Sequence, residues 1–321
     1  MELLCEKDYA QEMRESVWRE LSAVRRECFV RVRDGAELFC VCYEAPAPRG
    51  SVVLLHGLGE TVEKYREMCY YFLKSGLTVL IYEQRGHGRS THEVQAGLIY
   101  VRAFSQYVDD LLDVLASGAV KLPSPRYLYA HSMGGAVAAL ALEREGHGFA
   151  RAVLSSPMIA MQYKNVPRIL GYTASGIMRL LGRGKCRFPG VGEAPPPEKE
   201  SFLHSGATSE ARFEQYRALK SADRQLYASS VTNKWMWEAL ACTRDILRRG
   251  APERIGIPVR IYAASGEMLV LEEPQRRLAA RIPQGEFVRV EDAKHELYFT
   301  HDAVFAPYVR GILAFFEDDK E

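Results

Sequence analysis

The sequence predicts an α/β fold, in which a mostly parallel β-sheet carries helices on both faces. Short apolar runs that read as buried strands alternate with helical stretches at both ends of the chain. This alternation is typical of βαβ units. The chain has 321 residues, of which 47% are hydrophobic, so it can bury a large core. The alternation stops in one internal segment, which indicates an insertion into the fold.

The first half of the chain contains most of the predicted strands. After a helical start, RDGAELFCVCYEA predicts two strands joined by a hairpin turn at Asp34 and Gly35. The apolar run SVVLLHGLGE predicts a buried strand that leads into a glycine loop, and a helix is expected over 63–74. LTVLIYEQRGHGRS repeats the strand-then-loop pattern. A helix around 103–117, the strand RYLYAHS, a helix from Gly134 and the strand ARAVLSSPM follow.

The strand pattern breaks after Pro157 and resumes only at IPVRIYAASGE. The intervening sequence is helical and irregular, and GVGEAPPPEKE predicts an exposed loop within it. A last strand, EFVRVEDA, and a closing helix over about 302–317 complete the expected sheet. We therefore predict a core formed by residues 1–157 and 249–321, and a helical cap insertion over residues 158–248.

Composition excludes several classes of protein. The 42 basic and 41 acidic residues leave a formal charge of +1, which argues against a nucleic-acid partner. Seven cysteines lack metal-ligand spacing, so we expect free thiols and interpret Cys40 and Cys42 as core residues. The first twenty residues carry frequent charges and no stretch is as long as a membrane span. We therefore expect a cytoplasmic protein.

The segment YLYAHSMGGAVAAL, residues 127–140, places one serine between a predicted strand and a predicted helix. Its central residues A-H-S-M-G match the nucleophile elbow G-x-S-x-G, except that Ala130 replaces the first glycine. The tight turn requires small residues two positions before and after the serine, and Ala130 and Gly134 meet this requirement. The pattern predicts that Ser132 projects its hydroxyl out of the sheet while the Met133 amide faces a developing oxyanion.

An activated serine needs a base and an acid that orients the base, in the chain order serine, acid, histidine. His295 follows the last predicted strand in EDAKHELYF, where a loop can return its imidazole to the elbow. Four other histidines read as structural or surface residues: His56, His87, His147 and His204. The acid should follow the penultimate strand, where AASGEMLVLEE contains glutamates but no aspartate.

Five motifs, HGLGE, EQRGHGRS, AHSMGGA, SGEMLV and AKHELYF, occur in this order along the chain. Together they resemble the α/β-hydrolase family of monoacylglycerol lipases and bacterial lysophospholipases, and YVDDL is similar to the lysophospholipase branch. The resemblance covers nearly the whole chain from about residue 28 and is weakest in the insertion, which selects the substrate. It implies an eight-stranded sheet and a serine hydrolase that needs no metal or organic cofactor.

The resemblance implies roles for individual residues. Ser132 matches the nucleophile, His295 the general base, and Glu267 the acid, although the family has an aspartate at that place. Glutamate is one methylene longer and can serve in such triads. Three other acids stay open as alternatives: Glu272, Glu273 and Asp292. The oxyanion hole corresponds to the backbone N–H groups of Leu58 and Met133. We expect three further side chains to brace the two loops: Glu60, Arg85 and His87.

The cap insertion is expected to contact the acyl chain or a lipid surface. Its segment VPRILGYTASGIMRLLGRGKCR holds the residues that we predict to bind substrate: Ile169, Leu170, Ile177 and Met178. Basic residues are interleaved with them or follow them: Arg168, Arg179, Arg183, Lys185 and Arg187. This pattern suits an anionic lipid or membrane face, and a cap helix with a solvated basic side is the alternative. A second cluster is expected to pack at the base of the cap: Trp235, Met236, Trp237 and Leu240.

The predicted function is hydrolysis of the acyl ester of a monoacyl lipid, a lysophospholipid or a monoacylglycerol, through an acyl-enzyme. The expected partner is therefore a small-molecule acyl ester, with transient contact between the cap and a membrane surface. Two alternatives remain open. An aminopeptidase or amidase uses the same triad, and a catalytically silent scaffold would only bind a ligand or a protein partner.

Overall fold

The structure of the chain is a computed structural model that describes residues 2–162, 168–189, 192–228 and 230–318. Eight strands form its main sheet: β1 (Arg25–Arg31), β2 (Glu37–Tyr43), β3 (Gly50–Leu55), β4 (Leu77–Tyr82), β6 (Arg126–His131), β7 (Arg151–Ser155), β9 (Val259–Ala264) and β10 (Gly285–Val290). Their order in space is β1-β2-β4-β3-β6-β7-β9-β10. Strand β2 runs antiparallel to β1 and β4, and the other neighbours are parallel. The predicted fold class is confirmed.

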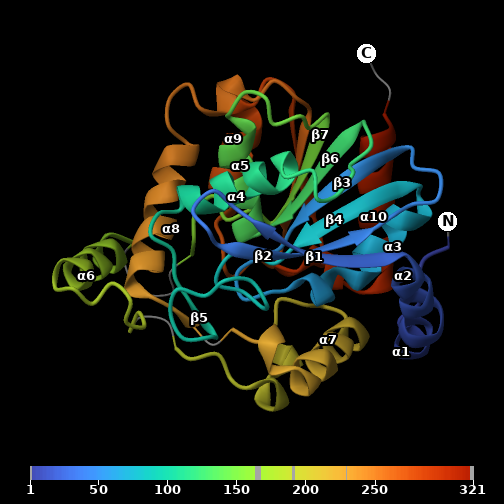
Figure 1. Ribbon diagram of the computed structural model, residues 1–321, viewed down its shortest axis with the longest axis horizontal. Helices are drawn as coiled ribbons and strands as arrows, with labels where there is room; N and C mark the ends of the chain where they lie inside the picture. The colour runs from blue at the N-terminus through green and yellow to red at the C-terminus, as the bar shows by residue number, and fades with distance from the viewer. Residues whose placement is uncertain (1, 163–167, 190–191, 229, 319–321) are drawn as a thin grey trace.

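Ten α-helices accompany the sheet in the described part of the chain: α1 (Tyr9–Glu12), α2 (Trp18–Val24), α3 (Arg66–Lys74), α4 (Ser105–Ala116), α5 (Met133–Leu142), α6 (Arg168–Leu180), α7 (Glu210–Ala222), α8 (Asn233–Ile246), α9 (Glu272–Arg281) and α10 (Asp302–Glu317). Helices α4, α5, α8 and α9 pack on one face of the sheet, and α1 to α3 and α10 pack on the other (Figure 1). None of the helices among these residues is long and apolar enough to cross a membrane.

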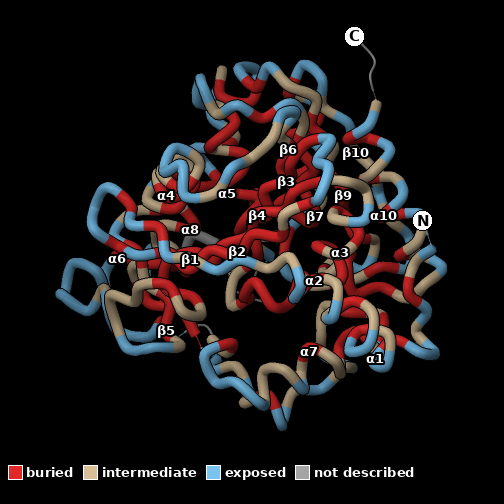
Figure 2. Tube along the Cα trace, turned by 45° about the vertical axis from the view of Figure 1, so that its right-hand side comes forward, coloured by how far each residue is buried: buried red, intermediate tan, exposed pale blue. Residues whose placement is uncertain are grey.

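The central strands form because their residues are apolar and often β-branched. Strands β3 and β4 are buried along their whole length, as expected for parallel strands that are covered on both faces. Figure 2 shows this centre as buried and the outer helical surfaces as exposed. The carboxyl ends of β3, β6 and β9 lie in the same region of the molecule, so the loops that follow them can share one site.

The chain between β7 and β9 carries α6, α7 and α8, which lie to the left of and below the sheet in Figure 1. Helix α7 is tied to the core by Arg212, whose buried guanidinium donates to Glu67 at 2.9 and 3.1 Å and to Asp302 at 3.0 Å. Helix α6 packs against α8, where Tyr172 stacks on Trp237 with ring centroids 3.8 Å apart. The division into a core and a cap insertion over residues 158–248 remains our proposal.

One small element was not predicted from the sequence. Strand β5 (Leu98–Ile99) pairs in parallel with β8 (Ser230–Val231) and so joins a core loop to the segment before α8. Each strand has only two residues, which is too short for a recognisable alternation pattern. This pairing helps to place α8 beside the carboxyl ends of the central strands.

Candidate active site

Ser132 lies at the sharp turn between β6 and α5. Its backbone has φ 51° and ψ −115°, a left-handed conformation that is rare for residues other than glycine. Two hydrogen bonds to the neighbouring segment hold this turn: the Ser132 amide donates to the Ser155 carbonyl at 3.0 Å, and the Met158 amide donates to the Ser132 carbonyl at 2.8 Å. The turn has the strand–serine–helix geometry that the motif predicts.

Two glycines after the serine allow α5 to approach the neighbouring backbone. A Cβ atom at Gly134 would lie 2.5 Å from the Leu55 carbonyl oxygen and 2.7 Å from that of His56. At Gly135 it would lie 2.5 Å from the Pro157 Cβ. On the other side of the serine, Ala130 is fully buried and supplies the small residue that the motif requires there.

This close approach makes Gly134 a sensitive position for stability. We expect Gly134→Ala to lower the free energy of unfolding by about 1–3 kcal/mol or more, because backbone atoms cannot move aside as a flexible side chain can. Gly256→Ala is the matched control, since a Cβ there meets nothing within 4 Å, and it should change stability by at most about 0.5 kcal/mol. Denaturant unfolding of both variants measures the difference. Equal stabilities would contradict the packing described here.

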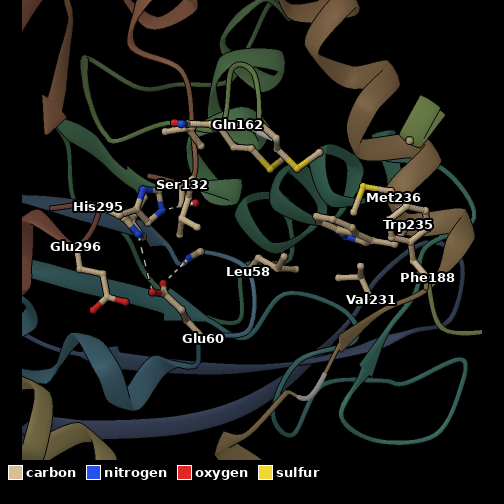
Figure 3. A pocket seen from close by; sticks show the side chains of 17 residues that line it. Leu58, Glu60, Ser132, Gln162, Phe188, Val231, Trp235, Met236, His295 and Glu296 are labelled. Atoms are coloured by element: carbon tan, nitrogen blue, oxygen red, sulfur yellow. Dashed lines mark hydrogen bonds and ion pairs between the residues drawn. The ribbon is translucent and has the colours of Figure 1, made fainter. Parts of the chain in front are cut away.

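The structure brings Ser132, Glu267 and His295 together. The His295 Nε2 atom lies 2.9 Å from the Ser132 Oγ, and the His295 Nδ1 atom lies 2.7 Å from a carboxylate oxygen of Glu267. Because the carboxylate can only accept, Nδ1 carries the proton and Nε2 is free to accept the serine proton. Figure 3 shows His295 beside Ser132 at one end of the pocket. His295 is 5% exposed, so bulk water screens this chain of bonds little.

Glu267 is held by the loop that follows it. Its second carboxylate oxygen accepts hydrogen bonds from the amides of Met268 and Leu269, both at 2.8 Å. Burial alone would raise the pKa of Glu267, but the hydrogen bonds from His295 and these amides outweigh it, so the pKa is lowered. Glu272, one of the alternatives, pairs instead with Arg276 and Arg289. Among the four acids considered, Glu267 is the one placed against His295.

The loop after β3 carries Leu58, one of the two residues predicted to form the oxyanion hole. Gly59 has a φ of +73°, which glycine adopts without strain because it has no Cβ. A Cβ at Gly57 would lie 2.8 Å from a Glu60 carboxylate oxygen. Leu58 lines the pocket that contains Ser132. Met133 is the first residue of α5, so its amide N–H has no acceptor within the helix. Both amides therefore stay candidates for the oxyanion hole.

The three side chains expected to brace these loops make different contacts. A Glu60 carboxylate oxygen accepts from the Gly57 amide at 2.6 Å and so holds the loop that carries Leu58. Arg85 donates to Asp110 at 2.5 and 2.7 Å and to Asp34 at 2.9 Å, which ties the loop after β4 to α4 and to the first hairpin. His87 is buried, and burial lowers its pKa to about 3, so its imidazole is neutral.

Next to Ser132 lies a pocket of about 460 Å³. Apolar side chains form most of its wall: Leu58, Met158, Met161, Phe188, Val231, Trp235, Met236, Leu269 and Val270. Figure 3 shows Phe188, Val231, Trp235 and Met236 at the end opposite His295, Glu60 and Glu296. The pocket is therefore apolar at one end and charged at the end where the serine lies. No group of three or more metal-binding side chains is found within the described ranges.

The structure corrects the predicted substrate-binding residues. Leu170, Ile177 and Met178 lie outside the pocket wall, and Leu170 and Ile177 are 56% and 51% exposed. The side chain of Ile169 lies outside the described part of the chain. The reason is the orientation of α6, which presents small residues such as Gly176 to Trp237 of α8 and turns its large apolar residues outward.

Trp235 and Met236 are expected to pack at the base of the cap rather than to face a ligand. Both are buried in the core, as expected, but they also line the pocket. Their neighbours Trp237 and Leu240 pack against Tyr172 of α6 and in the core respectively. Phe188 and Met158 were not singled out from the sequence. The run Met268–Val270 carries the one sequence signal for a pocket wall, because its apolar residues directly follow the predicted acid Glu267. Leu269 and Val270 of this run line the pocket.

Comparisons with known proteins agree with this geometry. The model of the family described as serine aminopeptidase, S33, matches residues 46–302. The chain is 27% identical over 260 residues, 80% of each protein, to a probable lysophospholipase L2 of Haemophilus influenzae. It is 36% identical over 129 residues to the monoglyceride lipase of Homo sapiens, covering 39% of this chain and 41% of that protein.

Solved structures share the fold. A soluble variant of monoglyceride lipase from Saccharomyces cerevisiae, solved with a substrate analog, superposes with a TM-score of 0.71 at 16% identity and covers 92% of this chain and 96% of that one. The family model spans most of the chain, including the strand–turn–helix segment around Ser132 and the loop around His295. The chain belongs to the serine aminopeptidase S33 family of α/β-hydrolases, in the branch that holds lysophospholipases and monoacylglycerol lipases, and it is a hydrolase.

Proposed function

We propose that the chain is a serine esterase that cleaves the acyl ester of a monoacyl lipid, a lysophospholipid or a monoacylglycerol. The observation that carries the proposal is the 2.9 Å contact between the Ser132 Oγ and the His295 Nε2 beside an apolar pocket of about 460 Å³. A pocket of this size suits a single acyl chain. The relatives named lysophospholipase and monoglyceride lipase support the same substrate class.

The reaction follows from the contacts of three side chains. His295 Nε2 accepts the Ser132 proton as the oxygen attacks the ester carbonyl, and Glu267 stabilises the imidazolium that forms. The amides of Leu58 and Met133 donate to the oxyanion. His295 then gives its proton to the departing alcohol oxygen, leaving the acyl group on Ser132. His295 then deprotonates a water molecule, which attacks the acyl carbonyl; the bond to the Ser132 Oγ breaks, the Oγ regains the proton from His295, and the fatty acid leaves.

A second pocket, with a more polar wall, adjoins the first and suits the alcohol part of such an ester. It has a volume of about 390 Å³ and shares Leu58, Glu60 and Glu296 with the pocket at Ser132. Charged and hydroxyl side chains contribute to its wall: Glu60, Lys64, Glu200, Ser201, Lys220, Tyr227 and Glu296. An ester that is apolar on the acyl side and polar on the alcohol side fits both pockets at once.

Hydrolysis of several substrates, assayed side by side, tests the proposal. The set contains a lysophospholipid, a monoacylglycerol, a triacylglycerol, a short synthetic ester and an aminoacyl amide. We expect the monoacyl lipids to have the highest kcat/KM, and the triacylglycerol to be a poor substrate because the pocket holds one chain. Preference for the aminoacyl amide would instead identify an aminopeptidase. No turnover of any of them by the folded protein would favour a silent scaffold.

Gly171 offers a way to test where the acyl chain lies. It lines the pocket, and a Cβ there meets only the Leu240 side chain, at 4.0 Å. We expect Gly171→Leu to fill part of the pocket and to lower kcat/KM for long-chain esters about tenfold or more relative to short ones, since each buried methylene is worth about 0.8 kcal/mol. Ala174→Leu, on the exposed side of the same helix, is the control. An unchanged chain-length profile in Gly171→Leu would place the acyl chain elsewhere.

We also propose that α6 contacts an anionic membrane face. Its large apolar residues point outward along one side of the helix and its end: Leu170, Ile177, Leu180 and Leu181, between 51% and 78% exposed. Their spacing of 7, 10 and 11 residues from Leu170 puts them on one face. Exposed arginines nearby, among them Arg179 and Arg183, supply the positive charge that attracts anionic lipid. The function of the helix would be to bring the pocket to its lipid substrate.

Vesicle binding tests this contact. We expect Leu180→Gln with Leu181→Gln to weaken binding to vesicles that contain anionic lipid about tenfold or more, because two exposed leucines no longer enter the bilayer interface. Raising the salt concentration should weaken binding of the unaltered protein as well. Leu203→Gln is the control, since Leu203 is 74% exposed but lies outside α6. Equal binding by the unaltered protein, the double variant and Leu203→Gln would refute the contact. The double variant should hydrolyse a short soluble ester as fast as the unaltered protein.

A further inference from the structure

Lys64 carries a buried ammonium group close to the candidate active site. It lies in the 3-10 turn Val62–Tyr65 before α3, and its Nζ donates to Glu60 at 2.8 Å and to Glu296 at 2.7 Å. Three aromatic rings surround the ammonium with centroids 5.2–5.5 Å away: Tyr216, Tyr298 and Phe299. Burial alone would lower the pKa of Lys64, but the two carboxylates outweigh it and raise the pKa, so the group is charged.

Glu60 links this ammonium to the loop that carries Leu58. One carboxylate oxygen accepts from the Gly57 amide at 2.6 Å and from the Tyr65 hydroxyl at 2.5 Å. The other accepts from Lys64 and, at 2.6 Å, from the Tyr298 hydroxyl. Burial would raise the pKa of Glu60, but Lys64 and the other donors together keep it well below its usual value. The Gly57 amide is thus held by an ionised carboxylate, one residue before Leu58.

Glu296 links the same ammonium to the loop that carries His295. Glu296 directly follows His295 in the chain, and the Glu296 amide donates to the Gly206 carbonyl at 2.8 Å. A Cβ at Gly206 would lie 2.9 Å from the Glu296 Cγ and 3.3 Å from the His295 Cβ, so Gly206 packs closely against these two side chains. One ammonium therefore joins the loop of the predicted oxyanion hole to the loop of the predicted base.

The carboxylates near His295 make the positive charge of the Lys64 ammonium important for the electrostatics of the site. Its direct partner is the Glu267 carboxylate, and Glu60 and Glu296 lie at the same end of the pocket (Figure 3). The His131 ring packs on His295 at 4.8 Å, but burial lowers the pKa of His131 to about 3, so it adds no charge. Two other lysines nearby have their own partners: Lys220 faces the same Tyr216 ring but is paired with Glu200, and the Lys294 ammonium lies over the Phe202 ring. Lys64 is thus the cation in direct contact with Glu60 and Glu296 among the described residues.

We propose that Lys64 is a positioning residue, which fixes the Leu58 amide through Glu60 and offsets the negative charge beside His295 through Glu60 and Glu296. The inference rests on the proposed esterase function of the same site. Removing the ammonium leaves two carboxylates without their shared cation near the base. A protonated imidazole is then favoured, and the Gly57–Leu58 backbone loses the charged anchor that holds it.

Kinetics on a short soluble ester test the role of Lys64. We expect Lys64→Met to lower kcat about ten- to a hundredfold with a smaller change in KM, because an amide of the oxyanion hole is displaced. The acidic limb of kcat/KM against pH should move up by about one unit, because the imidazolium is stabilised. Lys64→Arg keeps the charge and should keep the acidic limb at the pH of the unaltered protein. Lys74→Met is the control, since Lys74 pairs with Glu20 on the exposed end of α3.

Two further variants separate positioning from a merely structural role. Lys64→Met with Glu296→Gln has the same local net charge as the unaltered protein, so its acidic limb should return towards the original pH. Glu296→Gln alone should move the limb to lower pH, and it serves as the decisive variant if Lys64→Met does not fold. Folded variants whose limbs do not move, or all move in one direction, overturn the proposal. An unaltered protein without esterase activity would instead overturn the proposed function itself.

Discussion

Ser132→Ala should lower kcat for ester hydrolysis by a thousandfold or more, because no other group can form the acyl-enzyme. The Ser132 Oγ is the atom that lies 2.9 Å from the His295 Nε2, at the wall of the pocket. The same variant should lose covalent labelling by a fluorophosphonate, which reacts with an activated serine oxygen. Initial-rate kinetics and intact-protein mass spectrometry measure the two losses independently.

His295→Ala should also lose most of the label, since the hydroxyl would no longer have a proton acceptor. Ser117→Ala is the control for a serine far from the pocket, whose hydroxyl caps the end of α4 by donating to the Val114 carbonyl. It should label at the normal rate. A folded wild-type protein that refuses the label, or full turnover in Ser132→Ala, would exclude the proposed mechanism.

Glu267→Gln should lower kcat about a thousandfold, with little change in fold. The glutamine amide has no negative charge to stabilise the imidazolium, and its NH2 group can face the His295 Nδ1 and favour the wrong tautomer. The oxygen that accepts from the Met268 and Leu269 amides can remain in place, so the loop should keep its conformation. Steady-state kinetics and circular dichroism of the same preparation distinguish lost chemistry from lost structure.

Two matched variants sharpen the assignment of the acid. Glu267→Asp keeps the charge but is one methylene shorter, so we expect an intermediate loss of about tenfold. Glu272→Gln removes a carboxylate that pairs with Arg276 and Arg289, and its activity should be close to that of the wild type. If Glu272→Gln or Asp292→Asn were the damaging change and Glu267→Gln were not, another acid would orient the base.

Most of the fold could be predicted from the sequence because it depends on local patterns. Continuous apolar runs such as the one that becomes β3 (Gly50–Leu55) are buried on both faces, and a closing helix was expected where α10 (Asp302–Glu317) occurs. The turn at Ser132 was predictable for the same reason, since its strand, its small residues and its helix all lie within Arg126–Leu142. The two-residue strands β5 and β8 were too short to leave a pattern.

The placement of Glu267 could be predicted only in part. The loop after the penultimate strand was the expected place, but the sequence offers several glutamates there and an aspartate later at Asp292. The decision depended on a distance, the 2.7 Å contact with the His295 Nδ1. Side-chain length follows from the residue type, but the direction of the loop, which also determines such a distance, cannot be read from residue order.

The sequence by itself determined the α/β class, the turn that exposes Ser132 and the order of serine, acid and histidine, because each depends on residue types at short or ordered spacings. Tertiary structure alone decided which apolar residues form the pocket beside Ser132. An amphipathic helix in an insertion can turn its apolar side inward or outward, and the small residues of α6 let Trp237 pack so closely that Leu170 and Ile177 face outward. Trp235 and Met236 of α8 then line the pocket in their place. The contact of Lys64 with Glu296, across 232 positions, is likewise a product of packing.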